Sequence, residues 1–137
     1  MPAYVAGVDP EDTFAVLADA TRTGGSVGIV VCAWEPGQEP PPHTMPGTDQ
    51  VFVMLGGGRC GLTVDGRDLD LGAGQVAFVP RGSRVAVRVA GGGCRVLVVL
   101  VPPGPEAYLA TVSALPGTSP GTLITLAADH GVIVHPR

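Results

Sequence analysis

The sequence predicts an all-β domain, a sandwich or a barrel of short strands, with short helices near its C-terminal end. Its 21 glycines and 14 prolines separate short apolar runs, which is the pattern of many strands joined by tight turns. Asp65-Gly66 lies between two such runs and is a strong signal for a two-residue hairpin. The segment RVAVRV at 84–89 alternates in polarity, so its three valines share one face of a strand.

The apolar runs and their flanking residues place the other elements. Seven strands are expected, at 27–34, 50–55, 59–64, 67–71, 75–79, 83–90 and 94–101. Near the start, 10–20 is expected to be a helix, with Asp9 or Asp12 near its N-terminus. After the strands, helices are expected at 106–115 and 122–130, the second stopped by Gly131, and a last strand at 132–134.

Two of the expected strands have no polar face. Segments 51–55 and 96–101 are apolar at successive positions, so both of their faces require cover. A facing sheet would cover one side, and a helix or a partner subunit the other. We therefore expect a homodimer.

Length, charge and composition limit the classes of function that this chain is expected to have. The length of 137 residues suits one domain spanning 1–137. The eight basic residues are all scattered arginines and the net charge is -4, so we expect no nucleic-acid partner. The absence of lysine excludes Schiff-base chemistry. The longest apolar run, 96–103, is too short to cross a bilayer, and the first residues lack a signal-peptide pattern, so a cytoplasmic protein without a membrane partner is expected.

The three cysteines are expected to act as small buried apolar residues. Cys32, Cys60 and Cys94 all lie in apolar, strand-like runs. Their odd number and wide spacing argue against a disulfide framework and against a CxxC metal site.

Two separated groups of residues resemble the motifs of a known superfamily. The first group is Pro36-Gly37, His43, Gln50 and Gly57, and the second is Gly74-x5-Pro80-x-Gly82. This spacing resembles the cupin motifs G-x5-H-x-H-x(3,4)-E-x6-G and G-x5-P-x-G-x2-H-x3-N. The resemblance covers about 24–102. It implies a small cupin-type β-barrel, the double-stranded β-helix or jelly roll, with a helical tail at about 105–137.

The same comparison shows that the metal-ligand positions are degenerate. In resembling proteins, two histidines and a glutamate of the first motif and a histidine of the second hold one divalent metal. Here the first histidine is His43, whereas the other three positions carry Met45, Gln50 and Val85. The shorter spacing would instead place Asp49 at the glutamate position. We prefer Gln50, since its amide is closest in shape to glutamate and it would share a face with Phe52 and Met54.

This set of side chains is a poor one for the usual metals. Divalent iron, manganese, nickel or zinc requires several imidazole or carboxylate donors. A thioether suits copper(I), but one histidine with one methionine seldom suffices. We therefore expect no cofactor, with a metal-dependent dioxygenase or isomerase using atypical ligands as an alternative. His130 and His135 lie outside the motifs and are expected in an exposed tail.

The barrel interior next to His43 is expected to form an apolar cavity with a few polar groups. Such a cavity is how small-molecule sites are usually built. The alternative is that the side chains simply fill a closed barrel. Catalytic residues are expected to be His43 and Gln50, and the substrate-binding residues to be Met45, Phe52, Met54, Val85, Val87 and Trp34, with Cys32 as a further candidate from the same strand as Trp34.

The resulting expectation is a metal-independent cyclase or isomerase. It would act on a small apolar organic molecule, a polyketide-like or terpenoid-like biosynthetic intermediate, with His43 and Gln50 polarising a carbonyl or moving a proton. A non-catalytic small-molecule-binding protein is the alternative. The sequence contains no G-x-S-x-G elbow, P-loop or dinucleotide fingerprint. Nucleophilic chemistry by Cys32 beside His43 has no further support.

Overall fold

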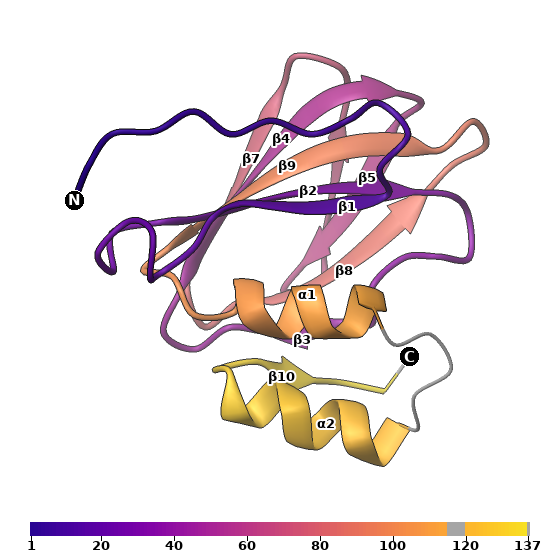
Figure 1. Ribbon diagram of the computed structural model, residues 1–137. Coiled ribbons are helices and arrows are strands. Elements are labelled where there is room, and N and C mark those ends of the chain that lie inside the picture. The colour runs from indigo at the N-terminus through magenta and orange to yellow at the C-terminus, as the bar shows by residue number, and fades with distance from the viewer. Residues whose placement is uncertain (115–119, 137) are drawn as a thin grey trace.

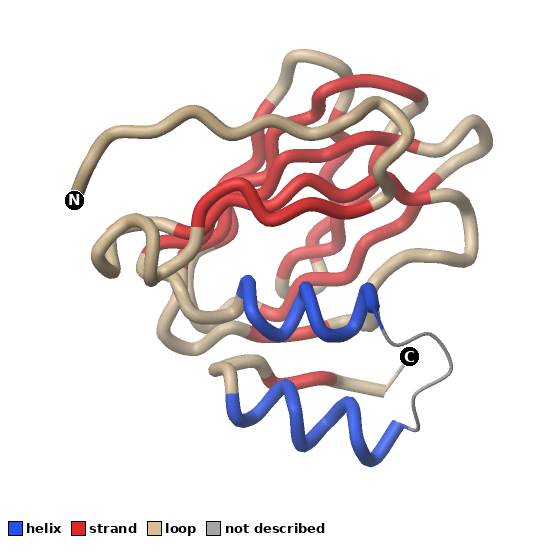
Figure 2. The backbone as a smooth tube through the Cα atoms, viewed as in Figure 1, coloured by secondary structure: helices blue, strands red, loops and turns tan. Residues whose placement is uncertain are grey.

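In the part of the chain that the structure describes, the fold consists of two five-stranded antiparallel sheets packed face to face, with two helices beside one end of them (Figures 1 and 2). The computed structural model describes residues 1–114 and 120–136. The first sheet has the order β1-β2-β9-β4-β7 and contains β1 (Phe14–Ala18), β2 (Gly28–Trp34), β9 (Cys94–Val101), β4 (Asp49–Gly57) and β7 (Val76–Val79). The second has the order β10-β3-β8-β5-β6 and contains β10 (Ile133–Val134), β3 (His43–Thr44), β8 (Arg84–Val89), β5 (Cys60–Val64) and β6 (Arg67–Leu71).

All seven predicted strands are present, with ends shifted by at most a few residues. The predicted hairpin joins β5 to β6, where Val64 pairs with Arg67. Its two central residues, Asp65 and Gly66, have φ values of 50° and 82°. Such left-handed conformations are what a tight hairpin turn requires, and asparagine, aspartate and glycine tolerate them best.

The core lies between the two sheets. In β8 the three valines face inward and are buried, as the alternation predicts, while the arginines are exposed. They pack in one cluster with inward residues of β2, β4 and β9. Cys32, Cys60 and Cys94 are free and buried, which agrees with their expected role.

The predicted helix at 10–20 is wrong. Residues Phe14–Ala18 form β1, an edge strand that pairs with β2 from Phe14↔Cys32 onwards. Phe14 and Val16 pack against the core from this strand, so pairing with a distant segment overrode the local helical pattern. The proline-rich connector also holds a short strand that was not predicted, β3, which bridges β8 and β10.

The C-terminal part has the predicted order of helix, helix and strand. The helices are α1 (Glu106–Ala114) and α2 (Pro120–Asp129). The predicted end of the first helix, Leu115, lies outside the described residues. After α2, Gly131 adopts a φ of 75° while Val132 donates its backbone N–H to the carbonyl of Ala127, so the glycine ends the helix as predicted. Within 1–114 and 120–136, no helix has the length and apolar character needed to cross a membrane.

The outer side of the first sheet is only partly covered. The N-terminal segment passes across it before it turns into β1 (Figure 1). Arg95 of β9 holds this segment by donating hydrogen bonds to the carbonyls of Asp9, Pro10 and Asp12. Towards the other edge four large apolar side chains remain exposed: Leu55, Val76, Phe78 and Val101. The homodimer expected to cover this face stays a prediction.

Candidate functional site

His43 is the centre of the candidate site. Strand β3 places it opposite Val85 of β8, and only 6% of its surface is exposed. Its Nδ1 lies 3.0 Å from the carbonyl oxygen of Pro41, and its Nε2 lies 3.3 Å from Oε1 of Gln50. The ring is therefore held on both sides, more loosely on the side of Gln50, because 3.3 Å exceeds the usual hydrogen-bond length.

The environment favours the neutral ring. Burial lowers the pKa of His43 below its ordinary value, against the opposing effect of its hydrogen bonds to Pro41 and Gln50, while the nearby His135 lowers it further. In a neutral ring Nδ1–H donates to the Pro41 carbonyl, which only accepts, and Nε2 carries a lone pair. The Gln50 amide can then turn its NH2 group towards Nε2, whereas a protonated ring would donate to Oε1 instead. Gln50 thus complements either form of His43.

The structure distinguishes Gln50 from Asp49, the two candidates for the motif's glutamate position. Gln50 points into the core and is 2% exposed. Asp49 points outward and accepts hydrogen bonds from the backbone N–H and the guanidinium of Arg81. These hydrogen bonds and the Arg81 charge lower the pKa of the Asp49 carboxyl. Asp49 therefore fastens the turn after β7, and Gln50 is the residue that meets His43.

A small inner pocket lies beside the His43–Gln50 pair. Its volume is about 20 Å³, which is enough for one water molecule or one ligand atom of similar size. The other lining residues are apolar or sulfur-containing: Cys32, Trp34, Pro40, Met45, Phe52, Val98 and Leu109.

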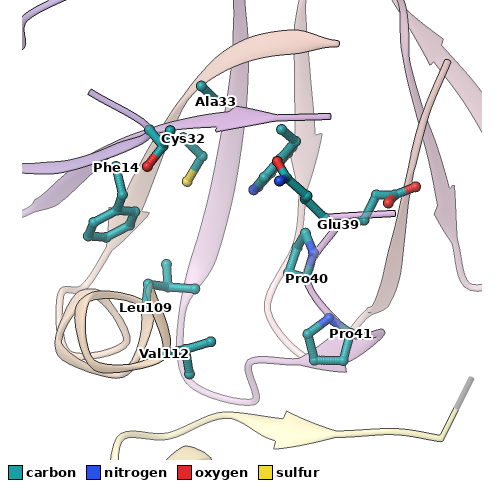
Figure 3. A pocket seen from close by; sticks show the side chains of 11 residues that line it. Phe14, Cys32, Ala33, Glu39, Pro40, Pro41, Leu109 and Val112 are labelled. Carbon is teal, nitrogen blue, oxygen red and sulfur yellow. The ribbon is translucent and has the colours of Figure 1, made fainter. Parts of the chain in front are cut away.

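A larger outer cavity adjoins the inner pocket. Its volume is about 380 Å³, near the lower end of the range for small-molecule sites. Figure 3 shows Phe14, Leu109 and Val112 along one side and Pro40 and Pro41 on the other, with the Cys32 thiol between them. The remaining lining residues are Thr13, Ala33, Trp34, Gln38 and Glu39. Four residues border both spaces: Cys32, Trp34, Pro40 and Leu109.

The predicted site residues fall into two groups. Met45, Phe52 and Trp34 border the inner pocket with the catalytic candidates His43 and Gln50, and so does Cys32. Met54, Val85 and Val87 instead pack inside the core cluster and border neither space. The expected cavity between the sheets is thus mostly filled by side chains, and the outer cavity lies at the end of the sheets, beside α1.

Sequence reasoning named Cys32 and Trp34 but missed the other residues that line the outer cavity. Phe14 comes from β1, Leu109 and Val112 come from α1, and Pro40 and Pro41 come from the connector. The spacing of Leu109 and Val112 places them on one face of a helix, which is the signal that would have identified one wall. No local pattern connects that face to Phe14, which lies at the other end of the sequence.

The two C-terminal histidines are less exposed than predicted. His130 and His135 are both half-buried. Nε2 of His135 lies 2.8 Å from the hydroxyl of Thr44, and its backbone N–H donates to the carbonyl of Pro42. His135 therefore ties the C-terminal strand to the segment that carries His43.

Comparison with known proteins gives the family. The family model described as "Cupin domain" matches residues 30–101, more than half of the chain. The chain belongs to the cupin family. No curated protein matches the chain.

Solved structures of other cupin-fold proteins resemble this one. KdgF from Halomonas sp. superposes with a TM-score of 0.63 at 14% identity, covering 78% of this chain and 99% of KdgF. A predicted oxalate decarboxylase from Thermotoga maritima gives 0.60 at 19% identity, covering 64% and 77%. The protein TT1209 from Thermus thermophilus gives 0.56 at 27% identity, covering 72% and 90%. These likenesses support the cupin fold.

The divalent metal implied by the cupin resemblance does not fit the residues present. His43, Met45 and Gln50 border one pocket, and Val85 is paired with His43. They supply one imidazole, a thioether, a neutral amide and an isopropyl group, where such ions require several imidazoles or carboxylates. Among residues 1–114 and 120–136, no three His, Cys, Asp or Glu side chains gather in a way that could hold an ion.

The burial of His43 predicts a pH dependence of stability. The folded state resists protonation of His43, so below about pH 6.5 the unfolded chain binds a proton that the folded chain binds less readily. The His43 contribution is complete above pH 6.5 and is lost as the pH falls towards the lowered pKa. We expect the wild type to lose up to about 1.4 kcal/mol per pH unit more than His43→Asn in this window.

Urea unfolding at about pH 7.5, 6.5 and 5.5 measures this difference. His130→Asn is the matched control, because it removes a half-buried histidine away from the pocket and is expected to keep the wild-type slope. Parallel pH profiles of the wild type and His43→Asn would contradict the prediction.

Proposed function

We propose that this cupin is a metal-independent isomerase or cyclase that acts on a small, largely apolar carbonyl compound of the polyketide-like or terpenoid-like kind. The observation that supports it most is the adjacency of the two spaces. Four residues border both the outer cavity and the inner pocket, which supports a ligand whose body lies in the outer cavity and whose end reaches His43 and Gln50. A polar pair at the closed end of an apolar cavity is a common arrangement in small-molecule sites.

The proposed chemistry begins with a proton transfer. A ligand oxygen entering the inner pocket would take the N–H of Gln50, leaving the Nε2 lone pair of His43 free to accept a proton from the carbon next to the carbonyl. Gln50 would stabilise the resulting enolate oxygen. In a β,γ-unsaturated substrate the imidazolium then returns the proton to the γ-carbon of the dienolate, which moves the double bond into conjugation. In a cyclisation the enolate closes a ring on a second carbonyl, and the imidazolium protonates the new alkoxide oxygen.

Two features of the site support this role for His43. The Pro41 carbonyl fixes the ring orientation through Nδ1, so that Nε2 is the atom facing Gln50. Since burial lowers the pKa of His43, the ring is present as the free base at neutral pH. The apolar walls of the outer cavity would hold the substrate in one orientation, which itself lowers the barrier.

A non-catalytic binding protein is the second candidate. The observation in its favour is that His43 and Gln50 are both buried and hydrogen-bonded to each other. A ligand that fills only the outer cavity would leave this pair undisturbed, and no reaction would follow.

The activities named for similar structures are not carried over. Oxalate, which the name of the Thermotoga maritima protein implies as a substrate, is a small dianion. The described residues lining the outer cavity include no Arg, Lys or His to neutralise such a molecule. An identity of 19% supports a shared fold and no shared substrate.

Hydrogen–deuterium exchange of a model ketone tests the proposed chemistry. With 2-tetralone in D2O, we expect the wild type to accelerate exchange of the protons next to the carbonyl. Proton NMR measures the rate of this exchange. His43→Asn keeps a donor for the Pro41 carbonyl but removes the base, and should slow the catalysed exchange by about 10²–10⁴-fold. Gln50→Leu should slow it by about 10²–10³-fold, because the enolate oxygen loses its donor.

His130→Asn is again the matched control and should exchange the ketone at the wild-type rate. If folded His43→Asn binds 2-tetralone and exchanges it as fast as the wild type, the proposed mechanism is wrong. Binding by the wild type with no acceleration at all would favour the non-catalytic alternative.

A further inference from the structure

We infer that the ligand is an uncharged molecule, with an apolar body for the outer cavity and a single protruding oxygen for the inner pocket. This inference rests on the proposed function, since it defines the substrate class of the same site. It is carried by two observations, the charges around the outer cavity and the size of the inner pocket.

The charge argument concerns the lining of the outer cavity. Among its described lining residues the one ionisable side chain that carries charge at neutral pH is Glu39. Its carboxylate accepts hydrogen bonds from the backbone N–H groups of Gly37 and Val89 and points away from Phe14 and Leu109 (Figure 3). An anionic ligand would lose its hydration here without gaining a cationic partner, and it would feel the negative charge of Glu39.

The polar groups that do reach the cavity are uncharged. Thr13 and Gln38 line the outer space, and the His43–Gln50 pair borders the inner one. Because burial lowers the pKa of His43, the ring adds no positive charge at neutral pH. Both spaces therefore offer hydrogen bonds and apolar contact rather than charge pairing.

The size argument concerns the end of the ligand. A volume of about 20 Å³ has room for about one water-sized group, so the end of the ligand that reaches His43 and Gln50 is small. A ketone, aldehyde or hydroxyl group meets this limit and can bond to Gln50, which both donates and accepts. The residues bordering both spaces, including Trp34 and Leu109, would surround the bond that joins the oxygen to the body of the molecule.

Three probes that share a tetrahydronaphthalene ring system test the charge argument and the size argument. They are 2-tetralone with one carbonyl oxygen, tetralin with no oxygen, and 1,2,3,4-tetrahydro-2-naphthoate with a carboxylate. Trp34 is the one tryptophan of the chain and borders both spaces, so its fluorescence reports binding at this site. We expect 2-tetralone to bind at least about tenfold more tightly than either of the others.

Two variants and one control variant test whether the effects arise at this site. Gln38→Arg places a cation at the exposed edge of the outer cavity and should tighten carboxylate binding by about tenfold or more relative to 2-tetralone. Gln75→Arg makes the same substitution away from this cavity, at another turn glutamine that accepts a backbone N–H, and should leave all affinities unchanged. Gln50→Leu should remove the advantage of 2-tetralone over tetralin.

The outcomes separate this inference from the proposed function. Equal binding of ketone and carboxylate by the wild type would overturn the inference while leaving a small-molecule site in place. Equal binding of ketone and tetralin would overturn the assignment of the oxygen to the inner pocket. If none of the three probes changes the Trp34 fluorescence or gives heat in titration calorimetry, the proposed function fails, and the inference fails with it.

Discussion

Three substitutions, Met45→His, Gln50→Glu and Val85→His, are expected to create a divalent metal site in this chain. The backbone already brings these positions together with His43, because Val85 pairs directly with His43 and the other two border the same pocket. The new set of three imidazoles and one carboxylate matches what zinc or cobalt requires. We expect the triple variant to bind Co²⁺ at least about a hundredfold more tightly than the wild type.

The substitutions are expected to lower the free energy of unfolding of the metal-free protein, because all three positions are buried. Val85 is fully buried, so histidine there is expected to destabilise the metal-free variant by about 1–3 kcal/mol through overpacking. Metal at about a hundred times its dissociation constant would stabilise the folded variant by about 2.7 kcal/mol. The visible absorption of Co²⁺ and the shift in melting temperature on adding metal are the measurements.

Adding His43→Ala to the triple variant is the matched control, since it removes one imidazole and should weaken Co²⁺ binding sharply. If the triple variant folds yet binds Co²⁺ no better than the wild type, these four side chains do not converge in solution as they do in the structure.

Glu106→Ala is expected to be among the most destabilising single changes in the molecule. Glu106 begins α1 and is only 4% exposed. Its carboxylate accepts hydrogen bonds from the backbone N–H groups of Ala20 and Gly104, which joins the segment after β1 to the start of the helix. Alanine would remove the acceptor of both N–H groups, which are only partly buried, so we expect a loss of about 1–3 kcal/mol.

Urea unfolding of Glu106→Ala measures this loss, with the exposed Glu11→Ala as the control, expected within about 0.5 kcal/mol of the wild type. Gly28 provides a second test. A Cβ at Gly28 would lie 2.9 Å from Oε1 of Glu106, so Gly28→Ala should displace the carboxylate. We expect Gly28→Ala to be less harmful in the Glu106→Ala background, and strictly additive effects would show that the two sites are not coupled.

The strands were predictable because their signals are local. Each signal comes from residues that are neighbours in the sequence. The signals are the alternation along 84–89, the Asp65-Gly66 turn, and the glycines and prolines between the apolar runs. The structure confirms the strands and the turn that they predict. The failure at β1 has the opposite cause. β1 is a strand because it pairs with β2, and no sequence pattern within 10–20 indicates that pairing.

The candidate site was predictable only in part, for the same reason. The inward positions of His43, Met45 and Gln50 follow from motif spacing and strand alternation, and the structure places them beside one pocket. The outer cavity needs β1, the connector and α1 to meet in space. Since those contacts join residues far apart in sequence, the cavity was expected between the sheets instead of at their end.

The origin of the cavity walls has a consequence for how such proteins diversify. The matched cupin segment spans 30–101, whereas Phe14, Leu109 and Val112 come from outside it. Mutations in these flanking segments would reshape one side of the outer cavity and leave the positions of His43 and Gln50 in the sequence unchanged. The segments that flank the matched region therefore contribute one wall of the outer cavity, and the matched region contributes the opposite wall and the His43–Gln50 pair.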